Sequence, residues 1–221
     1  MPKKLLIFPF GGNARESLLS VLALNQAQRE WDVVGFLDDD PLLRGRDYLG
    51  IKVLGGREVL EIHPDAFVLA VPGSPKGYLG RAAIIEGLPV DESRFATIVH
   101  PSVVKAPDAQ VGRNTLLMPN VVISCGVRVG SHCVVLPNTV VAHDSVVEDF
   151  CCIGSNVSIS GGVTIGRGCY IGSGARIRED LRIGERSLIG LGSNVIADVE
   201  GGVVAVGNPA RVLRRIALEV G

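Results

Sequence analysis

The residues of this sequence best suited to proton transfer are a histidine and the aspartate that follows it, His143 and Asp144. An imidazole titrates near neutral pH, so it can take a proton from a reacting group and release it again. A carboxylate bonded to one ring nitrogen would fix the tautomer and raise the basicity of the other nitrogen. The pair therefore indicates general-base chemistry, although tight bends also favour Asp144 for conformational reasons alone.

A six-residue repeat decides where this pair stands. From Val111 to Val195 every sixth residue is aliphatic, without an insertion, over fifteen consecutive hexads. A small or modest side chain stands two residues before each aliphatic one, and Asn, Gly or Asp stands three residues after it in 12 of the 15 hexads. Such a period predicts short strands separated by bends and stacked by parallel pairing into a prism. The exceptions at the bend position are His132, Phe150 and Arg186.

His143 comes just after the aliphatic Val141, so we expect it at a corner of the prism with its side chain pointing outward. Repeats such as VTIGRG, CYIGSG and LRIGER resemble those of the hexapeptide-repeat transferases. The resemblance implies an all-β left-handed parallel β-helix in which three hexads close one coil. With that closure, Gly161 lies beside His143 on the next coil and Gly162 lies beside Asp144. The two glycines would leave room for an extended pantetheine arm, and a backbone N–H there could stabilise an oxyanion.

The chain before the repeats has a different pattern. Apolar runs at residues 4–10, 31–37 and 66–71 predict strands, and helical patterns follow the first and third of them. This order predicts a small α/β domain with a parallel, Rossmann-like sheet and ligand-binding loops at the carboxyl ends of its strands. We therefore expect three segments: a nucleotide-sugar domain over residues 1–98, the β-helix over 99–198, and a cap and tail over 199–221.

The whole order resembles the PglD-like and NeuD-like sugar-nucleotide acyltransferases, which make acetamido sugars for bacterial glycans. The glycine turn after the first strand, the Phe-Leu-Asp-Asp end of the second and the closing VGNPA segment carry the resemblance. It implies transfer from acetyl-CoA to the amine of a nucleotide-linked amino sugar, with His143 as base, Asp144 as its orienting partner, and homotrimers with sites between subunits. The expected sugar is a 4-amino-4,6-dideoxyhexose, and O-acetylation of a sugar such as a sialic acid is the alternative.

The resemblance also assigns binding residues. The glycine turn and Asp-Asp pair are expected to hold the nucleotide sugar, although both also suit ordinary tight turns. Asn13 departs from the family, in which many members carry histidine at that position. The expected nucleotide-sugar residues are Gly11, Gly12, Asn13, Asp38, Asp39 and Gly73. The expected acetyl-CoA residues are Cys152, Gly161, Gly162, Ser173 and Leu191, the last two through main-chain atoms.

Composition and residue counts argue against several other partners, metal sites and functions. A formal net charge of -1 argues against nucleic acid as a partner, and no membrane span or signal peptide is visible, so the expected location is the cytoplasm. Zinc hydratases with this solenoid need three histidines, but the repeats contain only His132 and His143, so no metal is expected. The recurring thiols of Cys133, Cys151 and Cys169 are expected to fill the core. An ice-binding scaffold would need arrays of threonine, which the repeats lack.

Overall fold

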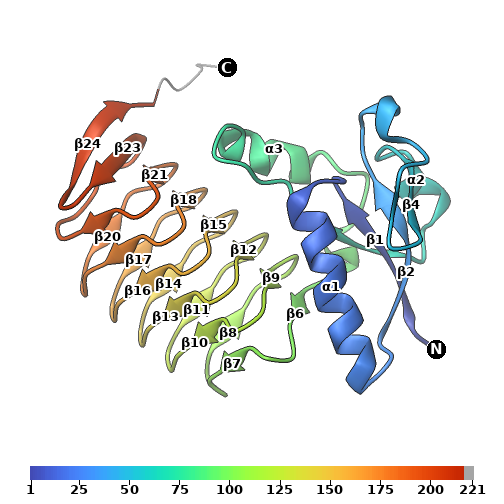
Figure 1. Cartoon of the computed structure of the whole chain (residues 1–221), viewed down its shortest axis with the longest axis horizontal. Helices are drawn as coiled ribbons and strands as arrows, with labels where there is room; N and C mark the ends of the chain where they lie inside the picture. Colours follow the sequence, from blue (N-terminus) through green and yellow to red (C-terminus); the bar gives the residue numbers. More distant parts are fainter. Residues whose placement is uncertain (217–221) are drawn as a thin grey trace.

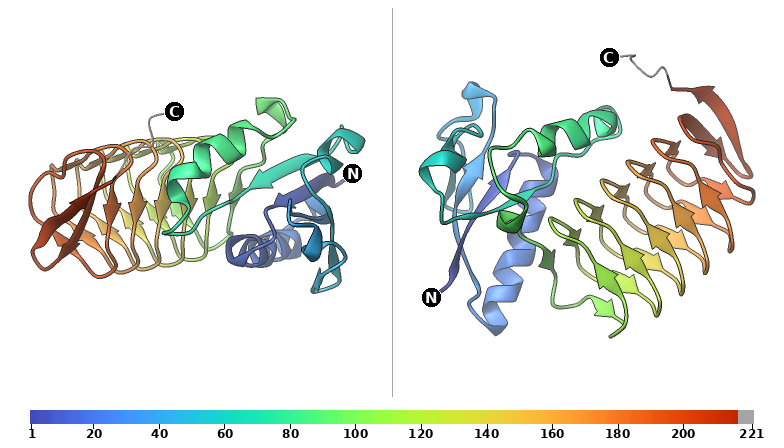
Figure 2. Two further views of the ribbon diagram at one scale, coloured as in Figure 1. Left: turned by 90° about the horizontal axis from the view of Figure 1, so that it is seen from above. Right: turned by 180° about the vertical axis from the view of Figure 1, so that it is seen from behind.

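The computed structural model describes residues 1–216, which form a mixed α/β domain followed by a three-sided parallel β-helix. The α/β domain stands beside the first coils of the β-helix, and the chain then proceeds coil by coil to a hairpin at the far end (Figures 1 and 2). None of the helices in this described part combines the length and the apolar character needed to cross a membrane.

The α/β domain is built on one five-stranded sheet with the strand order β3-β4-β2-β1-β5. The three strands expected from the sequence are present, but the sheet is mixed rather than parallel, because β3 runs antiparallel to β4. The sequence pattern does not predict this hairpin, because its first strand has only two residues and is too short to show alternation. The elements are β1 (Lys3–Phe8), α1 (Gly12–Ala27), β2 (Trp31–Leu37), η1 (Pro41–Leu43), β3 (Asp47–Tyr48), β4 (Ile51–Gly55), α2 (Val59–Ile62), β5 (Phe67–Ala70), η2 (Tyr78–Gly80), α3 (Arg81–Glu86) and η3 (Glu92–Arg94).

The strand β1 pairs in parallel with β2 on one side and with β5 on the other. The order of the sheet therefore reverses between β1 and β5, and the loops after these two strands diverge from the same sheet edge. In open α/β sheets, ligands bind in the crevice at this reversal. The loop after β1 contains Gly11, and the loop after β5 contains Gly73.

The β-helix has three faces, each a parallel sheet. Strands pair with the strand 18 residues further along, as Val122 does with Val140, so three hexads close one coil as expected. The first face contains β7 (Val104–Lys105), β10 (Val122–Ile123), β13 (Val140–Val141), β16 (Ser158–Ile159), β19 (Arg176–Ile177) and β22 (Asn194–Val195). The second contains β8 (Gln110–Val111), β11 (Arg128–Val129), β14 (Val146–Val147), β17 (Thr164–Ile165) and β20 (Arg182–Ile183). The third contains β6 (Ile98–Val99), β9 (Leu116–Leu117), β12 (Val134–Val135), β15 (Cys152–Ile153), β18 (Tyr170–Ile171), β21 (Leu188–Ile189), β23 (Val203–Gly207) and β24 (Ala210–Arg215).

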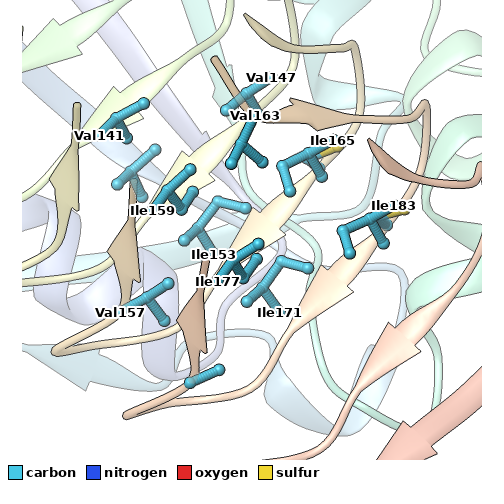
Figure 3. Packing of buried hydrophobic residues seen from close by; sticks show 14 of the residues in the cluster. Val141, Val147, Ile153, Val157, Ile159, Val163, Ile165, Ile171, Ile177 and Ile183 are labelled. Atoms are coloured by element: carbon cyan, nitrogen blue, oxygen red, sulfur yellow. The ribbon is translucent and has the colours of Figure 1, made fainter. Parts of the chain in front are cut away.

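The repeated aliphatic side chains stack in the interior of the prism (Figure 3). The slot two residues before them has a second role, because its hydroxyl or thiol bonds a carbonyl 15 residues further along. Thr139 donates to the Gly154 carbonyl at 2.7 Å, and Cys151 donates to the Gly166 carbonyl at 3.2 Å. The cysteines of this slot are buried in the core, as the repeat predicts. A polar group in the core thus satisfies a carbonyl that would otherwise lack a donor.

Three edges separate the faces, and we name them by their bends. The His143 edge joins the first and second faces, the docking edge joins the second and third, and the Asn138 edge joins the third and first. Bend residues adopt positive φ, which explains the preference for Gly, Asn and Asp. The docking edge carries Asn114, His132, Phe150, Gly168 and Arg186, so all three exceptions to the bend rule stand on this one edge.

The ends of the β-helix differ from its middle. The repeat begins two hexads earlier than the aliphatic pattern indicates, with β6 and β7. The pattern misses these hexads because Lys105 occupies a position that is aliphatic in the later ones. Its ammonium group bonds the carbonyls of Ala106 and Ala109 at the open end. At the other end, β23 and β24 form an antiparallel hairpin that continues the third face. Residues 217–221 of the expected cap and tail lie outside the described residues.

Candidate functional site

The imidazole of His143 is exposed on the outside of the β-helix. Its side chain is 63% accessible, and its Nδ1 lies 2.9 Å from Oδ2 of Asp144, which itself has a φ of 60° at the bend. In the tautomer with the proton on Nδ1, the ring donates to the carboxylate and presents a free lone pair on Nε2. The arrangement suits a base that accepts a proton from a group arriving from solvent or from a neighbouring molecule.

Gly161 of the next coil lies directly beneath this imidazole and contacts it. An ideal Cβ on Gly161 would lie 2.5 Å from Cε1 and 2.6 Å from Nε2 of His143. Real Cβ atoms do not approach other atoms so closely, so the ring has its position only because residue 161 is glycine. The sequence-based expectation that Gly161 adjoins His143 is met in the structure.

Gly162 stacks one coil beyond Asp144, as expected, but the space that its missing side chain leaves faces the following coil. Its φ of 68° is that of a bend glycine, and an added Cβ would collide with the carboxylate of Asp180 on the following coil. Its N–H donates to the His143 carbonyl at 2.9 Å. This donor is therefore engaged in the coil, and the expectation that it could serve an oxyanion is wrong for Gly162. Gly161 is buried beneath the imidazole, and its N–H donates to no acceptor among the described residues.

The other expected acetyl-CoA residues lie elsewhere on the same chain. Ser173 and Leu191 stand one coil apart just before bends of the Asn138 edge, and Leu191 is 83% exposed. Cys152 lies on the third face and is only 6% exposed, because the α/β domain covers it. Alternation along the strand correctly turns Cys152 away from the prism interior, but it gives no sign that a domain packs on that face. One chain therefore does not bring these residues together with His143.

The expected nucleotide-sugar residues at the sheet reversal do come together. Gly11 is the N-cap of α1 and provides no side-chain cap, and Gly12 and Asn13 open the helix. Asn13 donates from Nδ2 to the Val71 carbonyl at 3.3 Å. An ideal Cβ on Gly73 would lie 2.9 Å from Asn13 Nδ2, so the start of α1 and the loop after β5 lie close together at these two residues. The α1 N-terminus, with no acidic residue in its first turn, is a favourable place for an anion.

The aspartate pair at the end of β2 has intramolecular partners. The Asp38 carboxylate accepts from the Asp40 N–H at 2.9 Å, which closes a local turn. The Asp39 carboxylate binds the Arg57 guanidinium, with the shortest contact at 2.6 Å, and this hydrogen-bonded pairing lowers the pKa of Asp39. A ligand that used Asp39 would have to share it with Arg57. Arg57 itself has no sequence signal, because its partner is 18 residues away on another loop.

The docking edge holds the α/β domain to the β-helix. Asn114 exchanges two hydrogen bonds with the backbone of Ala70 in β5, at 2.8 and 2.9 Å. The His132 ring stacks on Phe150 with centroids 4.6 Å apart and meets Phe95 edge-on. In both views of Figure 2, α3 extends from the α/β domain beside the coils. At this edge the side chains of His132 and Phe150 contact the α/β domain, and the carbonyl of Arg186 accepts a hydrogen bond from Tyr78.

No cluster of three or more His, Cys, Asp or Glu side chains suited to a metal ion occurs within residues 1–216. His143 and His132 stand on different edges of the β-helix. His143 is exposed at its edge, whereas His132 is 5% exposed under the α/β domain.

Comparison with known proteins shows which proteins share the repeats and the fold. The family model described as bacterial transferase hexapeptide (six repeats) matches residues 108–143 and 144–179. No curated protein matches the sequence. Among solved structures, the acetyltransferase domain of PglB from Neisseria gonorrhoeae FA1090 is 25% identical and superposes with a TM-score of 0.84, covering 96% of this chain and 100% of that one.

A second solved structure is a mutant of perosamine N-acetyltransferase from Caulobacter crescentus in complex with CoA and GDP-perosamine. It is 25% identical, with a TM-score of 0.80, and the match covers 97% of this chain and 98% of that chain. The PglB domain in complex with acetyl coenzyme A is also similar, at 24% identity and a TM-score of 0.85 over 96% of this chain and 100% of that one. Residues 108–143 and 144–179 thus carry repeats of the bacterial transferase hexapeptide kind, and over nearly its whole length the chain is similar to these acetyltransferases.

Proposed function

We propose that the protein transfers the acetyl group of acetyl-CoA to the amine of a nucleotide-linked amino sugar, with His143 as general base. The observation that carries the proposal is the geometry at the His143 edge. Asp144 holds Nδ1, Nε2 has no hydrogen-bond partner among residues 1–216, and the missing side chain of Gly161 lets the ring lie against the backbone. The solved relatives named in complex with acetyl coenzyme A, or with CoA and GDP-perosamine, support this choice of donor and of acceptor class.

The chemistry asks little of the protein beyond positioning and one proton transfer. The sugar amine attacks the thioester carbonyl, a C–N bond forms, the C–S bond breaks, and the thiolate of coenzyme A leaves. His143 takes the proton that the amine loses and can return it to the thiolate, while Asp144 stabilises the ring when it is positively charged. The Gly161 N–H, which has no acceptor among the described residues, is suited to the oxyanion that develops on the carbonyl.

The complete site, in this proposal, lies between two copies of the chain. Ser173 and Leu191 stand on the Asn138 edge, whereas His143 stands on a different edge of the same prism. A single acetyl-CoA can contact both sets only if the Asn138 edge of one copy faces the His143 edge of another. The first face, which lies between these edges, exposes a column of outward valines, of which Val104 is 65% and Val140 is 39% accessible. Closed cyclic symmetry, as in a trimer, would repeat such a site around the assembly.

The acceptor we infer is a 4-amino-4,6-dideoxyhexose attached to a nucleoside diphosphate. Gly11, Gly12, Asn13 and Gly73 would hold the diphosphate end at the sheet reversal, and the Asp38-Asp39 turn would lie near the nucleoside. The test is to incubate the protein with acetyl-CoA and a panel of UDP-, GDP-, CDP- and dTDP-linked amino sugars. Thiol release is measured, and the sugar product is identified by mass spectrometry.

O-acetylation of a sugar such as a sialic acid is the second candidate, because the same base could activate a hydroxyl group. Hydroxylamine distinguishes the two products, since it cleaves an acetyl ester but leaves an amide intact. A hydroxylamine-resistant product that forms only on the amino sugars supports N-acetylation. A labile product on hydroxy sugars would replace the proposal with the O-acetyl reading.

A further inference from the structure

Arg81, the first residue of α3, is a buried cation with an incomplete set of partners. The residue is 1% exposed, and its Nε and Nη2 both donate to the His132 carbonyl, at 3.2 and 2.6 Å. Its Nη1 is also buried and has no hydrogen-bond partner in the described structure. No carboxylate of the described residues forms an ion pair with this guanidinium.

The acidic groups nearby do not neutralise it. Glu86 pairs with Arg167 at 2.9 Å, and Glu92 approaches the His132 ring at 3.7 Å. Burial raises the pKa of the Cys152 thiol, so this close neighbour of the guanidinium stays neutral near pH 7. A guanidinium taken out of water without an anionic partner is costly to the folded state. Such a group is expected where a ligand supplies the missing charge.

The free end of Arg81 points toward the sheet reversal. An ideal Cβ on Gly73 would lie 3.6 Å from Arg81 Nη1, 2.9 Å from Asn13 Nδ2 and 3.2 Å from Cys152 Sγ. The guanidinium thus lies immediately behind Gly73, whose other side is exposed to solvent. Asn13, Gly73 and Cys152 also line a cavity of about 30 Å³, which is room for about one water molecule.

The start of α1 meets Arg81 at this point. The helix is 16 residues long, and its N-cap Gly11 leaves the first N–H groups without a side-chain acceptor. A helix N-terminus and a buried guanidinium therefore converge from two elements on the loop at Gly73. Both favour negative charge, and the surrounding low dielectric strengthens the effect of each.

We propose that Arg81 is the buried positive charge that binds the diphosphate of the nucleotide ligand, together with the N-terminus of α1, across the Gly73 backbone. The inference rests on the proposed nucleotide-sugar function and adds to it the residue that recognises the phosphates. A glycine is needed at position 73 because a Cβ there would occupy the space between the backbone and the guanidinium and would push the two apart. Arg81 makes no contact with the reacting amine, so its contribution is to substrate binding.

The test compares nucleosides with nucleoside diphosphates. Calorimetry gives the affinity of the full-length protein for UDP and GDP and for uridine and guanosine, and the ratio isolates the phosphate contribution. Arg81→Gln should lower this ratio about tenfold, which is the order expected for a buried unit charge acting on an anion several ångströms away. Acetyl-CoA affinity should not change. Arg81→Lys, which keeps a positive charge, should recover part of the ratio.

Arg94→Gln is the matched control, because Arg94 is a partly buried arginine of the same domain whose guanidinium donates to the carbonyls of Leu60, His63 and Ala66. It should affect the melting temperature and leave the phosphate ratio unchanged. If Arg81→Gln does not fold, Gly73→Ala answers the same question, since it keeps the arginine and fills the intervening space.

Two failures are distinguishable. If the wild-type protein binds a nucleoside diphosphate and neither variant changes the ratio, the role of Arg81 is overturned and the proposed function is untouched. If the wild-type protein binds no nucleoside diphosphate, the nucleotide part of the proposed function fails and the role of Arg81 fails with it. Equal binding of inorganic pyrophosphate by the wild-type and Arg81→Gln proteins would also count against the role of Arg81.

Discussion

The imidazole of His143 rests against the backbone of Gly161, so closely that a Cβ on the glycine would lie 2.6 Å from Nε2. The two residues are 18 positions apart and meet because the chain closes one coil in that distance. The repeat therefore does more than build a scaffold. It sets a glycine beside a titratable residue at an outer edge of the β-helix, which fixes where the exposed imidazole lies.

The first prediction concerns that glycine. Gly161→Ala should displace the imidazole and lower kcat by about 10²-fold, since small misplacements of reacting groups cost that much. The melting temperature should change little, because the displaced ring is exposed and Gly161 does not have positive φ. Gly80→Ala is the control, as a Cβ there meets no heavy atom within 4 Å. Equal activity of Gly161→Ala and wild type would show that the position of the ring does not matter.

The second prediction concerns the carboxylate partner of the ring. Asp144→Asn keeps a residue that accepts the bend φ of 60° but removes the negative charge beside Nδ1. We expect kcat to fall on the order of tenfold with KM nearly unchanged, because the charge acts mainly on the protonated ring. Asp180→Asn, at the same edge one coil beyond Gly162, should have no such effect. Full activity of Asp144→Asn would assign Asp144 to the bend alone.

The third prediction tests whether a site is shared between copies of the chain. His143→Ala disables one edge, and Leu191→Arg obstructs the other with a bulky charge at an exposed position. Each variant alone should be inactive. When the two variants are coexpressed in equal amounts, about a quarter of wild-type activity should return. In random assembly about half of the His143 edges are intact and about half of the facing Leu191 edges are intact, so about a quarter of the sites combine both. A mixture that stays inactive would mean that each site belongs to a single chain.

The fourth prediction concerns pH and the docking edge. Burial lowers the pKa of His132 from its ordinary value of 6.5, with smaller opposing influences from Glu92 and further acidic residues and a lowering influence from Arg81. A histidine with a lowered folded-state pKa binds protons more readily in the unfolded chain. The neutral His132 is compatible with the folded protein, so its effect on stability is fully favourable above pH 6.5. As pH falls below that value, protonation of His132 in the unfolded chain progressively lowers the free energy of unfolding.

Melting temperatures measured between about pH 7.5 and pH 5 check this sign. The wild-type protein should lose more stability over that interval than His132→Asn, whose side chain suits the positive φ at this bend. His100, whose pKa burial also lowers, is present in both proteins and cancels in the comparison. Identical pH profiles would remove His132 as the cause.

Much of the β-helix follows from local pattern. A six-residue period specifies short strands and bends, and the three-hexad coil that the family resemblance implies then places Gly161 next to His143. The aliphatic residue expected at every sixth position is missing only where the side chain has a role other than burial in the core. At Lys105 the requirement is to bond free carbonyls at the open end, and this hid the first two hexads.

Domain packing could not be derived in the same way, because it depends on contacts between distant segments. Cys152 faces away from the core as alternation requires, but only the folded chain shows that the α/β domain covers it. The bend residues do give a partial indication of where the α/β domain packs. His132, Phe150 and Arg186 break the bend preference on one edge, and a repeat that departs from its rule at an 18-residue spacing marks where another domain docks.

The most direct test of the account is turnover by His143→Ala. Thiol release from acetyl-CoA is measured with the nucleotide-linked amino sugar that the wild-type protein uses, and acetyl-CoA affinity is measured separately. We expect kcat to fall by about 10²- to 10⁴-fold, the usual contribution of a general base, while the affinity for acetyl-CoA is retained. Turnover equal to that of the wild-type protein would show that His143 is not the base.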